Sequence, residues 1–413
     1  MEETEKHSKW DEPASPRLKC IFRIVVVLCV IVFAAEIGYL IVSHRQMQAE
    51  LNERLYVAFY TDQDEAYSVR SDWEELDDYR SEYDFNSRIY YGKLSKDAQR
   101  VYHFFEYAFD NRYSHILIDV RLIPQDVEME QILHYLMLDS GMIEQNLSRG
   151  ERVQANELVY DGLIEYRVDV EMHHVYVPGF EQEYFDKKIE ALTVAKQVVA
   201  EMPAGLTDAE KARYFFDYLG NRVVYKDAEN DGSRHYLYEA LCEHHTNCDG
   251  FANAYSLLCQ LGGIPCFEKV YWGEESGHTW NSVQLDGVWY NVDATSSPNI
   301  TNEGWTATLR FRFGYSDSRQ KNTPHYADIL PVCDGEMQPA TLHFASPSDA
   351  TAHTKLWQAI KNSKQPILMA LDTADKPQIK ALMQTVCDTY GCSVSHLPYE
   401  SPNGWFVYVL RTA

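Results

Sequence analysis

The chain has 413 residues, which is long enough for two or three domains. Hydrophobic residues make up 45% and charged residues 24%, a composition typical of globular proteins and not of disordered ones. The formal charge of -25 argues against nucleic acid and anionic lipid headgroups as partners, and it is compatible with peptides, glycans or cations.

An apolar stretch of 19 residues at 24–42, IVVVLCVIVFAAEIGYLIV, contains a single charged residue, Glu36. A helix of about 20 residues spans the hydrocarbon core of a bilayer. Basic residues are more numerous before this stretch than after it: Lys6, Lys9, Arg17, Lys19 and Arg23 against Arg45 and Arg54. This asymmetry predicts a single-pass anchor in the cell membrane with a cytoplasmic N-terminus and an extracytoplasmic body. A cleaved signal peptide, cut near the small residues of VFA, is the alternative.

The rest of the chain divides into segments of different character. Residues 44–88 are polar and acidic, which predicts a juxtamembrane stalk or a loosely packed helix. Helical and strand-like segments then alternate, with Ser95 as the N-cap of one helix and Thr207 with Glu210 as the capping box of another. The expected divisions are a cytoplasmic tail at 1–19, an anchor at 20–43, the stalk at 44–88, an α+β domain at 89–200, a catalytic domain at 201–335 and a small α/β unit at 336–413.

The segment TNCDGFANAYSLLCQLGG, at 246–263, reads as a turn followed by a helix that two glycines end. It places Cys248 at the helix start, where backbone N–H groups and the helix dipole favour a thiolate. Gly250 leaves room there for a substrate backbone. We interpret Cys248 as a nucleophile, whereas Cys259, on the apolar body of the helix, is expected to be structural.

Downstream, Asp286-Gly287 predicts a two-residue hairpin turn. If Leu285 pairs with Val288, the register places His278 and Asp293 on one face of the sheet as diagonal neighbours. The carboxylate of Asp293 would then orient the imidazole of His278 and leave its other nitrogen for Cys248.

A zinc site is an alternative for the same region, because LCEHHTNC contains Cys242, His244, His245 and Cys248. The spacing fits no familiar zinc finger, and Cys248 would be consumed as a ligand. We therefore expect no metal and no cofactor. Seven cysteines follow the apolar stretch, an odd number, so at least one of them is a free thiol or pairs between chains.

These residues resemble a bacterial transglutaminase-like domain, whose core is similar to that of papain-like cysteine proteases. The resemblance covers about 205–300 and rests on Cys-x-Gly, Gly-Ile-x-Cys, His-x-Trp and Trp-Tyr-x-x-Asp-x-Thr, which are here Cys248 and Gly250; Gly263, Ile264 and Cys266; His278 and Trp280; and Trp289, Tyr290, Asp293 and Thr295. It implies a Cys-His-Asp triad and a thioester acyl-enzyme. Animal members that transamidate carry an upstream Trp that helps to hold the oxyanion, and this chain has no Trp between Trp73 and Trp272. The backbone N–H of Cys248 is one candidate oxyanion donor, and Tyr236 or Tyr238 is a candidate for the second.

We therefore expect an α+β fold in which a nucleophile helix packs on an antiparallel sheet of a transglutaminase-like, papain-like core. The expected catalytic residues are Cys248, His278 and Asp293, acting on amide or peptide bonds of extracytoplasmic protein or cell-wall peptide by hydrolysis or transamidation. A catalytically silent binding or scaffold module with the same fold is the alternative. The sequence leaves the oligomeric state open.

Overall fold

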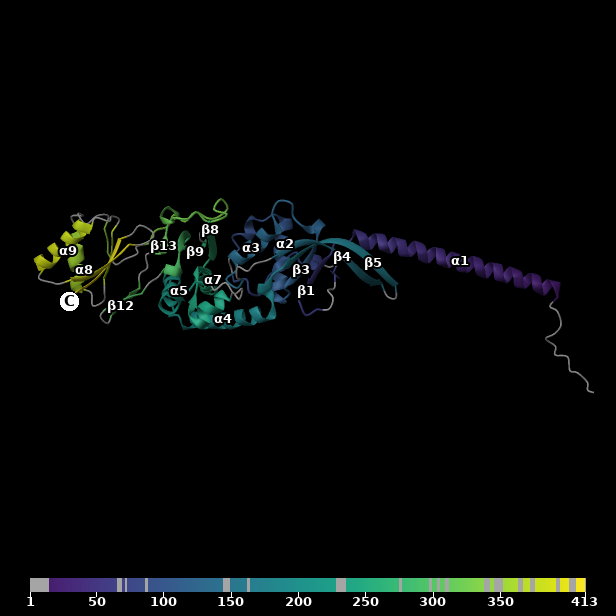
Figure 1. The fold of residues 1–413 in the computed structure, drawn as a ribbon, viewed down its shortest axis with the longest axis horizontal. Coiled ribbons are helices and arrows are strands. Elements are labelled where there is room, and N and C mark those ends of the chain that lie inside the picture. The colour runs from purple at the N-terminus through teal and green to yellow at the C-terminus, as the bar shows by residue number, and fades with distance from the viewer. Residues whose placement is uncertain are drawn as a thin grey trace, which may run out of the picture.

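The structure is a computed structural model, in which α1 and a C-terminal α/β unit lie at opposite ends of an elongated chain (Figure 1). It describes residues 15–64, 69–70, 73–85, 88–143, 149–161, 164–227, 235–274, 277–296, 299–302, 305–308, 312–337, 342–344, 352–362, 367–371, 376–390, 394–400 and 406–412. Between α1 and the C-terminal unit lie two layered bodies, each a sheet covered by helices.

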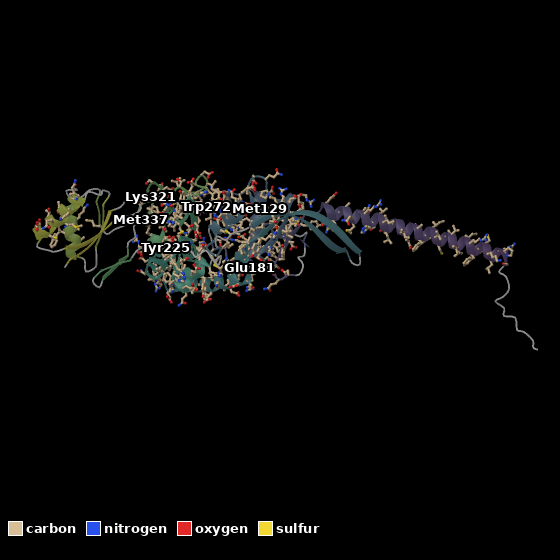
Figure 2. All side chains as sticks on the ribbon, in the orientation of Figure 1. Met129, Glu181, Tyr225, Trp272, Lys321 and Met337 are labelled. Carbon is tan, nitrogen blue, oxygen red and sulfur yellow. The ribbon has the colours of Figure 1, made fainter. Side chains whose placement is uncertain are left out.

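Helix α1, Pro16–Glu53, contains the apolar stretch and begins after Ser15, whose side chain caps it. Its length and the mean hydropathy of 2.8 of its apolar window are sufficient to cross a membrane, and that window is not buried against any other part of the molecule. Figure 2 shows its side chains projecting all round the helix. The C-terminal end of α1 packs on the body, where Leu51 is buried and its carbonyl accepts a hydrogen bond of 2.6 Å from the Tyr56 hydroxyl.

The first body is an antiparallel sheet of five strands in the order β2-β1-β3-β5-β4. Its strands are β1 Val57–Tyr60, β2 Val69–Arg70, β3 His115–Asp119, β4 Arg149–Asp161 and β5 Ile164–Tyr176. Helices α2, Lys96–Asp110, and α3, Met129–Asp139, supply its core. Ser95 caps α2, as the sequence predicts.

The prediction of a stalk at 44–88 is wrong for much of that segment. Residues 57–60 form β1, which lies between β2 and β3 in the sheet. The 3₁₀ turn Trp73–Leu76 buries Trp73 and Leu76 and leaves Glu74 and Glu75 outside. The acidic residues therefore coat one side of a packed segment whose few apolar residues enter the core.

The second body is an antiparallel sheet in the order β13-β10-β9-β8. Its strands are β8 Cys266–Trp272, β9 Gly277–Leu285, β10 Val288–Val292 and β13 Phe313–Tyr315. The predicted hairpin register is confirmed, since Leu285 pairs with Val288 and Val283 with Tyr290. The turn residues Asp286 and Gly287 have φ of 51° and 81°, as a type I′ turn requires.

Helix α7, Cys248–Leu261, packs on this sheet against β9. It ends at Gly262 and Gly263, as predicted, and Gly263 has φ of 78°. Helices α4, Gln182–Glu201, and α5, Asp208–Arg222, pack on α7, and α5 begins with the predicted capping box of Thr207 and Glu210. The connection into α7 contains β6 Val224–Tyr225, α6 Tyr236–Tyr238, a π-helical turn at Glu239–Glu243 and β7 His245–Thr246.

The remaining elements form the C-terminal part. Strands β11 Asn299–Asn302 and β12 Trp305–Thr308 make a hairpin. The terminal unit is a sheet of order β14-β15-β17-β16 with two helices, built from β14 Leu342–Phe344, α8 Ala352–Asn362, β15 Ile367–Leu371, α9 Lys376–Tyr390, β16 Val394–Glu400 and β17 Phe406–Thr412.

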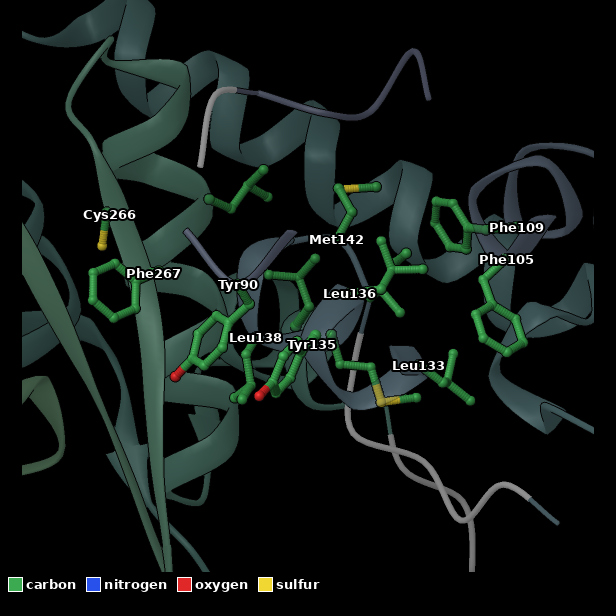
Figure 3. Packing of buried hydrophobic residues seen from close by; sticks show 14 of the residues in the cluster. Tyr90, Phe105, Phe109, Leu133, Tyr135, Leu136, Leu138, Met142, Cys266 and Phe267 are labelled. Carbon is green, nitrogen blue, oxygen red and sulfur yellow. The ribbon is translucent and has the colours of Figure 1, made fainter. Parts of the chain in front are cut away.

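The two central bodies share one hydrophobic core. Figure 3 shows Tyr90 between Phe267 of β8 and Tyr135 of α3, at ring distances of 5.8 and 5.0 Å. The Tyr90 hydroxyl also donates to the carbonyl of Glu268 at 2.9 Å. Helix α4 bridges both bodies, because its Phe185 packs on Phe109 of α2. The domain boundary that the sequence places near residue 200 stays a prediction.

We predict that Gly141→Ala, at the end of α3, lowers the melting temperature by disturbing this shared core. A Cβ there would lie 2.6 Å from the backbone nitrogen of Leu257 in α7, so the two helices must separate. Such overpacking costs about 1–3 kcal/mol of unfolding free energy. Thermal melts of the detergent-solubilised chain measure it. The control is Gly92→Ala, where a Cβ meets nothing within 4 Å. An unchanged melting temperature for Gly141→Ala would contradict the packing of α3 on α7.

Candidate active site

Cys248 is the first residue of α7, and the preceding loop is shaped for a helix start. The side-chain oxygen of Asn247 accepts hydrogen bonds from the backbone N–H groups of Asp249 and Gly250, at 3.1 and 3.3 Å. This cap satisfies two of the N–H groups that a helix start leaves without an intrahelical acceptor. As the first residue of α7, Cys248 lies at the positive end of the helix dipole. Its side chain is half-buried and therefore remains accessible to solvent.

Gly250 has a packing role that the sequence does not suggest. A Cβ at this position would lie 2.7 Å from the carbonyl oxygen of Tyr236 and would also meet the hydroxyl of Thr246. Gly250 is therefore required by the close packing of α6 and β7 on the helix start. That it also leaves room for a substrate backbone stays a prediction.

His278 lies near the start of β9, between a carboxylate and a thiol. Its Nε2 is 2.8 Å from Oδ2 of Asp293, so the predicted hydrogen bond between these side chains is confirmed. The side chain of Cys248 also acts on the imidazole and helps to raise its pKa. The structure thus brings all three of the predicted site residues together.

Asp293 directly follows β10 and is almost completely buried, with 1% of its surface exposed. Its Oδ1 accepts a hydrogen bond of 3.1 Å from the backbone N–H of Thr295. Its Oδ2, already bonded to His278, forms an ion pair with Arg312. The backbone N–H of Asp293 donates to the carbonyl of Arg312 at 2.9 Å, which continues the pairing of β10 with β13.

These contacts shift the pKa values of the pair in opposite directions. Burial alone would raise the pKa of Asp293, but the charges of Arg312 and His278 outweigh burial and lower it to about 2. Burial alone would lower the pKa of His278, but the charge and hydrogen bond of Asp293, together with Cys248, raise it to about 10. The site therefore favours an imidazolium beside an ionised carboxylate.

A buried polar network beside His278 restricts the position of its imidazole. The ring of Trp280 stacks at 5.9 Å and 17° to the imidazole, and its Nε1 donates to Oδ1 of Asn291 at 3.1 Å. The same oxygen accepts from Nζ of Lys269, which also contacts Asp317 and Cys333 at 3.3 Å. Each of these groups fixes the next, so the position of the imidazole depends on residues of three strands.

Sequence reasoning missed Tyr225 and Arg312. Tyr225, labelled in Figure 2, pairs with Thr246 across β6 and β7, just before the nucleophile. Its side chain is 48% exposed, and burial together with the charge of Cys248 raises its pKa to about 12. The short strand VVYK was the available signal for Tyr225. Arg312 gave no signal, because it lies 19 positions beyond Asp293, just before another strand.

The tyrosines that the sequence favoured as oxyanion donors are placed less well for that role. Tyr236 is buried, with 3% of its surface exposed. The ring of Tyr238 lies 5.8 Å from Nζ of Lys187, on α4. Tyr225, whose pKa the charge of Cys248 helps to raise, is a further candidate.

The residues of the zinc alternative do not converge. Within the described residues, no three His, Cys, Asp or Glu side chains are grouped as metal ligands. Burial raises the pKa of the Cys242 thiol to about 11, which disfavours the thiolate that a metal needs. His245 lies 3.5 Å from the Glu243 carboxylate, and His244 has φ of 60°.

Comparison with known proteins identifies the second body. Residues 194–294 match the family model of the transglutaminase-like superfamily. Kyphoscoliosis peptidase is 29% identical in its human form and 27% in its mouse form, each over 127 residues that cover 27% of this chain. The chain matches only 19% of the length of these relatives.

Two solved structures are similar to parts of the chain. One described as a TGase has 15% identity and a TM-score of 0.25, covering 38% of this chain and 48% of its own. The periplasmic domain of TgpA from Pseudomonas aeruginosa has 11% identity and a TM-score of 0.20, covering 44% and 70%.

We predict that the pair of His278 and Asp293 stabilises the fold most strongly between about pH 4 and 6.5. The raised pKa of His278 means that its contribution is complete below 6.5 and is lost as pH rises to about 10. The lowered pKa of Asp293 means that its contribution is complete above 3.8 and is lost as pH falls to about 2.

The measurement is the difference in melting temperature between the wild type and His278→Gln at pH 6 and pH 10. This difference should shrink at the higher pH. The matched control is His245→Gln, at the surface. A difference that is equal at both values would show that His278 carries no charge when folded at pH 6.

Proposed function

Because the chain contains a transglutaminase-like domain, we propose that it is a membrane-anchored thiol enzyme that transfers acyl groups from amide or peptide bonds. Cys248 is the nucleophile, His278 is the general base and then the general acid, and Asp293 orients His278. The observation that supports this most directly is the hydrogen bond of 2.8 Å from the His278 imidazole to the Asp293 carboxylate, beside Cys248, whose side chain helps to raise the pKa of that imidazole.

In the first half of the reaction, His278 takes the thiol proton and the Cys248 thiolate attacks the amide carbonyl carbon. Negative charge develops on the carbonyl oxygen, where the backbone N–H of Cys248 and the Tyr225 hydroxyl are the proposed donors. The imidazolium then gives its proton to the amine as the C–N bond breaks. The products are a free amine and a thioester on Cys248.

In the second half, His278 takes a proton from the acceptor, which attacks the thioester and releases Cys248. Water as the acceptor gives hydrolysis, and an amine gives transamidation. The curated relatives are named peptidases, which favours water and a protein or peptide substrate for this chain.

We further propose that α1 anchors the protein in the cell membrane, with the N-terminus in the cytoplasm and the catalytic domain outside. The basic residues before the apolar stretch and the length of α1 support this orientation. The packing of Leu51 and Tyr56 then joins the membrane helix to the first body without a long flexible linker.

We predict that iodoacetamide at neutral pH labels Cys248 at least about tenfold faster than Cys387, a thiol of similar exposure in α9. His278→Ala should remove this advantage, because the thiolate loses its imidazolium partner. Mass spectrometry of the labelled full-length chain in detergent measures both rates. His245→Ala is the matched control and should leave labelling unchanged. If Cys248 reacts no faster than Cys387 in the wild type, a binding or scaffold module replaces the enzyme.

We predict that protease added to intact cells releases a fragment that contains Cys248. The reason is the proposed orientation of α1, which exposes everything beyond about Arg45. Detection by antibodies against each end of the chain measures it. Protection of that fragment, with cleavage of the N-terminus instead, would reverse the orientation. A free mature protein that starts near Ala35 would indicate a cleaved signal peptide.

A further inference from the structure

We infer that Arg312 is a positioning residue of the site, which holds Asp293 in place and shares its carboxylate oxygen with His278. This inference rests on the proposed function, because it assigns Arg312 a part in the cycle of the same three residues.

Arg312 holds Asp293 through two separate contacts. Its guanidinium pairs with Oδ2 of Asp293, and its backbone carbonyl accepts the N–H of Asp293 at 2.9 Å. Both contacts come from the residue just before β13, so the pairing of β10 with β13 sets the distance. The Arg312 side chain is only 15% exposed, which restricts where the guanidinium can move.

The contacts of the Asp293 carboxylate are divided between its two oxygens. Oδ1 accepts from the backbone of Thr295, and Oδ2 accepts from both His278 and Arg312. His278 and Arg312 therefore draw on the charge of one oxygen. The cation of Arg312 reduces the stabilisation that this oxygen gives to the imidazolium, and at the same time it stabilises the carboxylate itself.

The reaction cycle gives this second cation a function. His278 is positive only while it holds the proton of Cys248, and it becomes neutral when it gives that proton to the leaving amine. A carboxylate that is 1% exposed is costly to leave without a counter-charge, and it would then take up a proton itself. Arginine stays charged at every working pH, so Arg312 supplies the counter-charge during the steps in which the imidazole is neutral.

Other titratable groups face this site from each neighbouring element. Cys248 lies on α7, where Asp249 accepts from Thr279 of β9 at 2.5 Å. Tyr315 on β13 is buried, and its hydroxyl donates to Gln320 at 3.0 Å. Tyr225 approaches from β6. The charges that act most strongly on Asp293 are those of Arg312 and His278.

The test is the pH profile of Cys248 alkylation by iodoacetate, measured on the full-length chain in detergent. The anionic reagent reacts fastest while Cys248 is a thiolate and His278 is an imidazolium, so the profile is bell-shaped. In Arg312→Met, the loss of a cation should make Cys248 and Asp293 harder to ionise and His278 harder to deprotonate. The rising and the falling limb of the bell-shaped profile should therefore both move to higher pH, by about one unit.

Three further variants make the result specific. Arg312→Gln keeps a hydrogen-bond donor on a shorter, uncharged side chain and should behave like Arg312→Met. It serves as the test if the methionine variant fails to fold. Arg312→Lys restores a cation and should return the limbs toward their wild-type positions. Arg319→Met, at the surface beside Glu336, is the matched control and should leave the profile unchanged.

The outcomes separate this inference from the proposed function. If the wild-type Cys248 shows no bell-shaped profile and no advantage over Cys387, the proposed function fails. If the wild type shows both, His278→Ala abolishes them and the Arg312 variants leave both limbs in place, only this inference fails. A lower melting temperature in the Arg312 variants with unmoved limbs would likewise overturn it and leave Arg312 a purely structural residue.

Discussion

The buried carboxylate of Asp293 is the group on which the candidate site depends. It is removed from water at the end of β10, and it receives hydrogen bonds from β9, from the turn that follows it and from the segment before β13. Burying such a charge is unfavourable unless its partners are held in place. The order of the strands in the sheet provides these partners, and the orientation of His278 toward Cys248 follows from them.

The rigidity of the site also comes from the first body. The hydroxyl of Tyr90 bonds the carbonyl of Glu268 in β8, and Gln260 of α7 donates to the carbonyl of Asp139 at 2.9 Å. Burial raises the pKa of the Asp139 carboxyl to about 8, although three donors from Tyr90, Tyr91 and Tyr102 oppose the shift. The nucleophile helix is therefore packed on both of its sides. In the proposed orientation, the first body also separates the site from the membrane (Figure 1).

Local signals in the sequence were sufficient for much of the second body. Asp286-Gly287 determines a type I′ turn, and a two-residue turn leaves a single register for β9 and β10. That register alone is enough to predict the contact between His278 and Asp293, which are 15 positions apart. The caps at Ser95 and Thr207 and the end of α7 at Gly262 were predictable for the same reason, since each depends on residues within a few positions.

What the sequence by itself determined was the set of contacts made within one helix, one turn or one hairpin, together with the apolar helix α1. Tertiary structure alone decided that residues 57–60 enter the first sheet, that Gly250 makes room for Tyr236 and Thr246, and that Arg312 reaches Asp293. Each of these depends on which distant segments pair or pack together. A sheet brings such segments side by side without leaving any regular spacing in the sequence, because strand order is selected by the total burial of the core and not by neighbouring residues.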